Sequence, residues 1–163
     1  MSSEIDSFGA LEKSVMENMR MTYSEKVIDH FLNPRNAGEF DYAEGYAKVT
    51  GPCGDTMQIC LKVKDDIITE ARFMTDGCGA SIACGSATTE LTIRKSITEA
   101  LEITQDDILN SLEGLSESEV HCALLAANTL KQAVKDYLSL RREPWKKAYR
   151  TIEPFGQVRR TDG

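Results

Sequence analysis

Two short runs of alternating apolar and polar residues, joined by a pair of aspartates, constrain the fold of this chain more than any other feature. In the first run, four apolar side chains alternate with four others: Met57, Ile59, Leu61 and Val63 with Gln58, Cys60, Lys62 and Lys64. The second run follows Asp65 and Asp66 and passes through Ile67, Ala71 and Phe73. Because side chains along a strand point alternately to its two faces, the pattern predicts two antiparallel strands joined by a tight turn. Residues 46–50 are expected to add an edge strand.

Helical periodicity occurs on both sides of these strands. Residues 23–31 predict a short helix that ends before an Asn-Pro-Arg-Asn-Ala-Gly turn, and residues 79–95, rich in small side chains, predict a helix packed closely on the sheet. Residues 97–112 predict two short helices, and residues 120–138 place their apolar side chains on one face of a long helix. The sequence therefore predicts an α+β fold, in which helices pack on one face of a small antiparallel sheet of about three strands.

The size and charge of the chain restrict its organisation and its partners. Its 163 residues, 41% of them hydrophobic, fit one compact folded domain. We expect an amino-terminal extension at residues 1–20, the folded domain at residues 21–150, and a basic, loosely ordered tail at residues 151–163. With 19 basic against 26 acidic side chains, the net charge of -7 offers no global positive field for nucleic acid or an anionic membrane.

Neither a membrane segment nor a targeting signal is indicated by the sequence. No stretch approaches the roughly 20 apolar residues that a membrane-spanning helix needs. The acidic residues 1–20 match neither a secretion signal nor an organellar transit peptide. We therefore expect a cytoplasmic location.

Five cysteines, an odd number in a chain expected to stay reduced, favour metal binding or thiol chemistry over disulfides. Cys53 and Asp55 lie in the loop that enters one predicted strand, and Cys78 lies in the loop that leaves the next. His121 and Cys122 lie at the start of the long helix. Since each position is at the end of an element, the five residues can converge on one site.

These donor types suit a soft metal, because thiolate selects zinc, copper(I) and iron-sulfur clusters. Structural zinc usually draws on closely spaced cysteine pairs, and the chain has none. In a cluster with three cysteine ligands, Asp55 or His121 would take the fourth position, and a hard carboxylate would hold the cluster loosely. The helix starts at Cys78 and Cys122 are expected to favour thiolate.

Each of these residues also has a purely structural interpretation. Asp55 also suits a cap on its own turn, and His121 with Cys122 also suits an ordinary helix start. Cys60 and Cys84 have no ligand-like neighbours and are expected to be small buried hydrophobic residues. It is the joint occurrence of the candidate ligands that favours a metal site.

Four motifs occur in order along the chain: residues 23–31 with 33–38, residues 51–55, residues 76–83, and residues 121–122. In order and spacing they resemble the U-type iron-sulfur scaffold family, which includes IscU and the amino-terminal domain of NifU. The resemblance runs from residue 21 to residue 137 and implies an α+β cluster assembly scaffold and carrier, not an enzyme. It implies that iron and a transient 2Fe-2S cluster are bound by Cys53, Asp55, Cys78, His121 and Cys122.

The resemblance also implies protein partners. They are a cysteine desulfurase that delivers sulfur as persulfide, an electron donor such as a ferredoxin, and recipient apo-proteins. The sequence does not decide which cysteine first accepts this sulfur, and Cys122 is our hypothesis. A DnaK-type chaperone is doubtful, because many members carry Leu-Pro-Pro-Val-Lys before the His-Cys pair and residues 115–120 here read Leu-Ser-Glu-Ser-Glu-Val. A basic patch is either a docking site for an acidic partner such as the desulfurase or simply a solvated helix end: Arg141, Arg142, Lys146, Lys147 and Arg150.

Two alternatives use zinc. A zinc-bound sulfur acceptor of the SufU branch would have a long insertion before the third cysteine and an arginine in place of His121. Here the segment between Cys78 and Cys122 is short and His121 is present, so the scaffold is favoured, with zinc as an ion for its cluster-free form. A zinc hydrolase such as a nucleotide deaminase would need His-x-Glu and Cys-x-x-Cys motifs, and the sequence contains neither.

Overall fold

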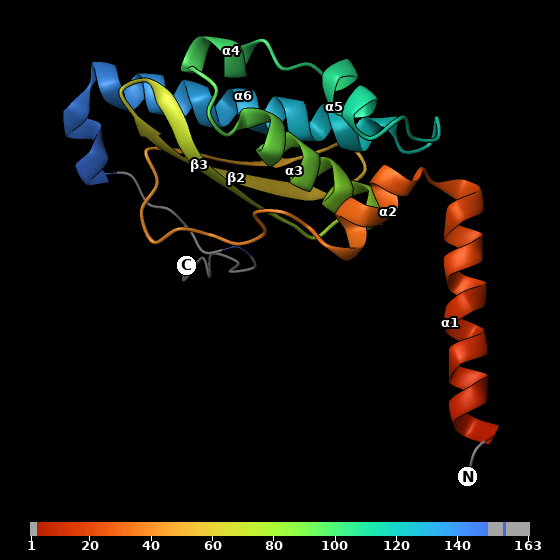
Figure 1. Ribbon diagram of the computed structural model, residues 1–163. Coiled ribbons are helices and arrows are strands. Elements are labelled where there is room, and N and C mark those ends of the chain that lie inside the picture. The colour runs from red at the N-terminus through yellow and green to blue at the C-terminus, as the bar shows by residue number, and fades with distance from the viewer. Residues whose placement is uncertain (1–2, 150–154, 156–163) are drawn as a thin grey trace.

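A computed structural model describes residues 3–149 and residue 155 (Figure 1). Two helices precede a three-stranded sheet, and further helices follow it. The amino-terminal elements are α1 (Ser3–Thr22), α2 (Glu25–Leu32), β1 (Gly45–Thr50), β2 (Thr56–Lys64) and β3 (Ile67–Thr75). The later elements are α3 (Gly79–Thr92), α4 (Ile97–Leu101), α5 (Gln105–Ser111), α6 (Val120–Arg142) and the 3-10 helix η1 (Pro144–Tyr149).

The sheet is antiparallel with the strand order β1-β2-β3, so β2 is its central strand. Asp65 and Asp66, at the turn between β2 and β3, have φ angles of 52° and 61°. Two successive positive φ angles are typical of a tight hairpin turn, and aspartate tolerates this conformation better than most residues. The predicted pair of strands, their turn and the edge strand are all confirmed.

One face of the sheet carries the core and is covered by α3 and α6 (Figure 1). Met57, Ile59 and Leu61 of β2 are at most 1% exposed, and Phe73 of β3 is 2% exposed. α3 lies so close that a Cβ on Gly85 would come within 2.4 Å of the Phe73 ring. The predicted α+β class is confirmed, and the small residues of α3 give the close packing expected of them.

The outer edge of β3 is paired with a segment from before the sheet. Phe73 donates its backbone N–H to the Asn36 carbonyl at 3.0 Å, and Gly38 donates to the Phe73 carbonyl at 2.9 Å. This pairing satisfies backbone groups that an edge strand would leave open. The sequence predicts only a turn at residues 33–38, and the pairing of this segment with β3 was not predicted.

The second face of the sheet is also covered, in part by Phe40, which follows residues 33–38 in the chain. The Phe40 ring lies 4.5 Å from the Lys62 ammonium and 4.5 Å from the Arg72 guanidinium, which are cation–π contacts. Gln58 and Cys60 on this face are each only 1% exposed. The prediction that Cys60 is a buried hydrophobic residue is confirmed, and Cys84 of α3 is likewise fully buried.

Helix α1 leaves the body of the molecule (Figure 1) and presents the exposed apolar side chains Phe8, Leu11 and Val15. It occupies most of the predicted extension at residues 1–20, for which the sequence analysis assigned no secondary structure. The division into extension, domain and tail stays a prediction, and the tail at residues 151–163 lies outside the described residues except for Phe155. Within the described part of the chain, no helix is both long and apolar enough to cross a membrane.

Candidate metal centre

The loop between β1 and β2 carries Cys53 and Asp55. Two backbone bonds fold it: Gly51 donates to the Asp55 carbonyl at 2.8 Å, and Gly54 donates to the Gly51 carbonyl at 3.0 Å. Gly54 has a φ of +87°, a conformation that other residues rarely adopt. The loop leaves Cys53 exposed and Asp55 partly buried.

Cys78 is the N-cap residue of α3, with an extended backbone and an exposed side chain. The loop before it is tied to β2, because Thr56 donates its backbone N–H to Asp76 Oδ1 at 2.7 Å and accepts from Thr75 Oγ1 at 2.8 Å through its carbonyl. Cys78 therefore lies beside the loop of Asp55, at the helix end whose free N–H groups favour negative charge.

Cys122 lies in the first turn of α6 and is 1% exposed. Burial raises the pKa of its thiol to about 11, although the hydrogen bond from Ser81 acts in the opposite direction. Desolvation of the charged form therefore opposes the thiolate that the helix start was expected to favour at Cys122.

Three of the five predicted residues meet at one point. Ligand atoms of Asp55, Cys78 and Cys122, one from each, all lie within 4.8 Å of one another. The three come from the β1–β2 loop, the N-terminus of α3 and the first turn of α6, elements that are distant in sequence. Two thiols and a carboxylate at this separation can bind one metal ion with little rearrangement.

The other two predicted residues lie next to this triangle. Cys53, Asp55 and His121 line one cavity of ≈ 220 Å³, so Asp55 belongs to both the triangle and the cavity. His121 Nε2 is 3.7 Å from Cys122 Sγ. The apolar side chains of Leu124 and Leu125 form part of the wall. The five residues therefore border one continuous region of the surface.

Sequence reasoning missed Ser81. Its side chain is fully buried, and its Oγ lies 3.4 Å from both Asp55 Oδ2 and Cys122 Sγ, so its one hydrogen can donate to either. A signal was available, because Ser81 follows Cys78 by three residues in a predicted helix, and residues at that spacing lie on the same face.

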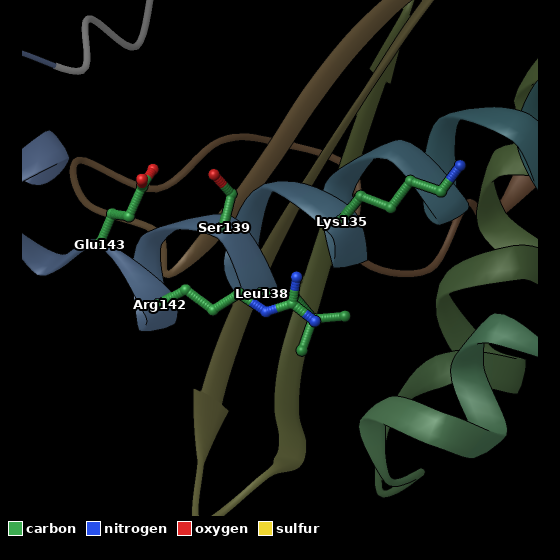
Figure 2. A pocket seen from close by; sticks show the side chains of 5 residues that line it. All are labelled: Lys135, Leu138, Ser139, Arg142 and Glu143. Atoms are coloured by element: carbon green, nitrogen blue, oxygen red, sulfur yellow. The ribbon is translucent and has the colours of Figure 1, made fainter.

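A second hollow, ≈ 510 Å³ in volume, lies along the last turns of α6 (Figure 2). Lys135, Leu138, Ser139, Arg142 and Glu143 line it. Two of these are cationic side chains that face solvent on an otherwise acidic protein. The hollow therefore has the charge expected of a surface that binds acidic groups.

The fold and the site together define a class: α+β proteins with an open group of thiols and one carboxylate that is able to hold a soft metal. Comparison with known proteins narrows this class. The family model described as NifU-like N terminal domain matches residues 22–143. The iron-sulfur cluster assembly scaffold protein IscU 1 of Archaeoglobus fulgidus is 48% identical over 116 residues, which are 71% of this chain and 76% of that protein.

Two further comparisons agree. The iron-sulfur cluster assembly scaffold protein IscU of Escherichia coli (strain K12) is 48% identical over 126 residues, 74% of this chain and 98% of that protein. The crystal structure of the N-terminal part of a NifU-like protein from Brucella abortus has a TM-score of 0.60 at 15% identity, over 71% of this chain and 94% of that one, and this likeness concerns the fold alone. The chain belongs to the IscU/NifU amino-terminal-domain family of iron-sulfur cluster assembly scaffolds.

Proposed function

We propose that this protein assembles a 2Fe-2S cluster on Cys53, Asp55, Cys78, His121 and Cys122 and then transfers it to apo-proteins. Membership of the scaffold family makes the chain an iron-sulfur cluster assembly scaffold rather than an enzyme. The observation that carries the choice of residues is the triangle of Asp55, Cys78 and Cys122, whose ligand atoms lie within 4.8 Å.

The cluster is the cargo of such a protein, and the ligand set suits a cargo. Thiolates bind iron strongly, whereas a carboxylate is a hard donor that matches soft cluster iron poorly. Cys53 and Cys78 are exposed, so iron and sulfur can reach the site from solvent or from a bound partner. Zinc fits the same thiols and carboxylate and is the ion proposed for the cluster-free form.

The chemistry of assembly requires two kinds of partner. The outer sulfur of a persulfide must gain two electrons before it becomes sulfide, so a cysteine desulfurase and an electron donor such as a ferredoxin are both needed. Recipient apo-proteins complete the set. We expect this exchange in the cytoplasm, where thiols stay reduced.

The basic patch at the end of α6 is the surface proposed for an acidic face of the desulfurase. Arg141 is already bound to Asp66 at 2.7 Å, and Lys146 is paired with Glu143. Within the described residues, Arg142 forms no ion pair, so its charge is available to a partner. Arg150, also assigned to the patch, lies outside the described residues.

Anaerobic reconstitution with iron, cysteine and a cysteine desulfurase tests the function. The mixture also contains dithiothreitol as the reductant that converts persulfide sulfur to sulfide. We expect visible charge-transfer absorption with equal amounts of iron and sulfide in the wild type, and loss of both when Cys53, Cys78 or Cys122 is replaced by serine. Alanine at Cys60 or Cys84, which lie in the core, provides the matched control and should retain the cluster. Stoichiometric zinc that iron and the desulfurase do not displace would instead support the zinc-bound sulfur acceptor.

A further inference from the structure

The side chain of Ser81 lies among three candidate metal ligands that come from three different elements. Its Oγ is 3.4 Å from Asp55 Oδ2, 3.4 Å from Cys122 Sγ and 3.9 Å from Cys78 Sγ. The side chain is fully buried, so water does not compete freely for the hydroxyl. One small polar group therefore contacts every member of the triangle.

The threonine hydroxyls in the later turns of α3 behave differently. Thr88 donates to the Cys84 carbonyl at 2.7 Å, Thr89 to the Ser86 carbonyl at 2.8 Å and Thr92 to the Thr88 carbonyl at 2.6 Å, and each of these bonds lies within the helix. Such bonds to the preceding turn are the usual arrangement for a hydroxyl inside a helix. Ser81 instead directs its hydroxyl toward the side chains of the β1–β2 loop and of α6.

The neighbouring loop makes room for this arrangement. A Cβ on Gly77 would come within 2.4 Å of Ser81 Oγ and within 3.0 Å of Asp55 Oδ2. The absence of a side chain at position 77 therefore lets the hydroxyl and the carboxylate approach each other.

We infer that Ser81 is a positioning residue, which holds the Asp55 carboxylate and the Cys122 thiol at the separation that a metal ion needs before the ion enters. This inference rests on the proposed function and concerns the same site. Groups that orient metal ligands without binding the metal typically change metal affinity by about 10–100-fold when they are removed. Without the hydroxyl, the β1–β2 loop and α6 lose a direct link at the metal centre, and the ion must order them itself.

Co²⁺ is a suitable probe, because its thiolate charge-transfer and ligand-field bands report the donor atoms. Wild type and Ser81→Ala would be titrated with Co²⁺ under anaerobic conditions, with a chelator of known affinity as competitor. We expect Ser81→Ala to bind roughly tenfold or more weakly, with unchanged band positions since the ligands are the same.

Ser86→Ala is the matched control. Ser86 is another fully buried serine of α3, but its Oγ accepts from the Arg35 backbone N–H at 2.8 Å and lies 2.7 Å from His30 Nδ1, away from the metal centre. This control should bind Co²⁺ with about the wild-type affinity, even if thermal unfolding shows a loss of stability.

The outcomes separate the inference from the proposed function. Equal Co²⁺ affinity in Ser81→Ala and wild type would overturn the inference, as would equal weakening in Ser81→Ala and Ser86→Ala, which would reduce Ser81 to a structural residue of α3. Shifted bands in Ser81→Ala would place the hydroxyl in the coordination shell and would also overturn it. A wild-type protein without thiolate charge-transfer bands would contradict the proposed function itself, and the inference with it.

Discussion

Tyr23 donates its hydroxyl to Glu119 Oε1 at 2.6 Å, and this bond ties the short connection between α1 and α2 to the residue before α6. The hydrogen bond to this carboxylate raises the pKa of Tyr23 to about 12. Ser116 donates to the other carboxylate oxygen at 3.1 Å. Residues 115–120, whose sequence departs from the chaperone-recognition motif, are therefore held against the body next to His121.

Removing the Tyr23 hydroxyl should destabilise the protein. Tyr23→Phe deletes a hydrogen bond to a charged group and should lower the free energy of unfolding by about 1.5 kcal/mol, measured by urea denaturation. Tyr42→Phe is the control, because Tyr42 is 51% exposed. Equal effects of the two substitutions would show that the bond to Glu119 contributes nothing specific.

Gly85 should not tolerate even one added methyl group. In Gly85→Ala the new Cβ would lie 2.4 Å from the Phe73 ring, so α3 or the ring must move. Overpacking of this kind typically costs about 1–3 kcal/mol, and the melting temperature should fall accordingly. Gly9→Ala tests the specificity of the effect, because nothing lies within 4 Å of its Cβ and alanine favours the α1 helix. A Gly85→Ala protein as stable as Gly9→Ala would contradict the packing described for α3.

His30 should make stability depend on pH. It is 6% exposed, and desolvation by burial lowers its pKa from the usual 6.5, against the opposing effect of Glu90 and with a smaller contribution from Arg35. The unfolded state then binds the proton more readily than the folded state. The stability is therefore greatest above the unfolded pKa of about 6.5 and falls as the pH drops below it.

The measurement is the free energy of unfolding between pH 8 and pH 5.5. The fall at low pH should be shallower in His30→Gln, which has no imidazole to protonate, although this variant is less stable at pH 8 because it loses the contact with Ser86. Ser86→Ala supplies the control, since it also loses the contact with His30 but keeps the imidazole, and it should retain the fall at low pH. An unchanged slope in His30→Gln would remove His30 from the explanation.

The five thiols should differ in their reactivity. Cys53 and Cys78 are exposed, whereas Cys60, Cys84 and Cys122 are buried. Burial also raises the pKa of Cys122 and Cys84, so their thiolate fractions at neutral pH are small. Iodoacetamide at pH 7.5 should therefore label Cys53 and Cys78 first. Mass spectrometry of peptides taken at successive times measures the labelling of each cysteine. Initial labelling at Cys122 would support the sequence-based choice of that residue as the first sulfur acceptor.

Much of the fold was predictable because local patterns determine it. The alternation along β2 and β3, the aspartate turn and the apolar face of α6 all act within a few residues of one another. The burial of Gln58 was not predictable from such patterns, because it depends on a segment distant in sequence that covers the second face of the sheet. The alternation of residues along β2 carries no information about that contact.

The site was also predictable only in part. The ends of predicted elements brought Asp55, Cys78 and Cys122 together as expected. The raised pKa of Cys122 was not predictable, because the helix terminus is visible in the sequence whereas the depth of burial is a property of the folded chain. Ser81 was overlooked because a serine in a helix carries no chemical signature of its own.

The side chain of Asp55 contributes little to the structure of its turn. The effects of replacing it should therefore report its chemical role at the metal centre. The turn that contains it is closed by backbone groups, since Gly51 donates to the Asp55 carbonyl rather than to its carboxylate. The carboxylate accepts a hydrogen bond from Ser81. Asp55→Ala should therefore fold normally, and its effects should appear at the metal centre. A neighbouring aspartate offers the opposite case, because the Asp76 carboxylate accepts the Thr56 backbone N–H at 2.7 Å and fixes the loop.

Replacing Asp55 with alanine should make a bound cluster more persistent and its transfer slower. A carboxylate bonds weakly to soft cluster iron, and its displacement opens a position where the thiolate of a recipient can attack. If His121 takes the vacant position, spontaneous decay and transfer to an apo-ferredoxin should both slow, on the order of tenfold, as followed by circular dichroism. Asp76→Ala should instead lower the melting temperature and leave transfer from the loaded protein near the wild-type rate. Because Asp55→Ala keeps the turn intact, equal decay and equal transfer in this variant and in the wild type would mean that cluster release does not begin at Asp55.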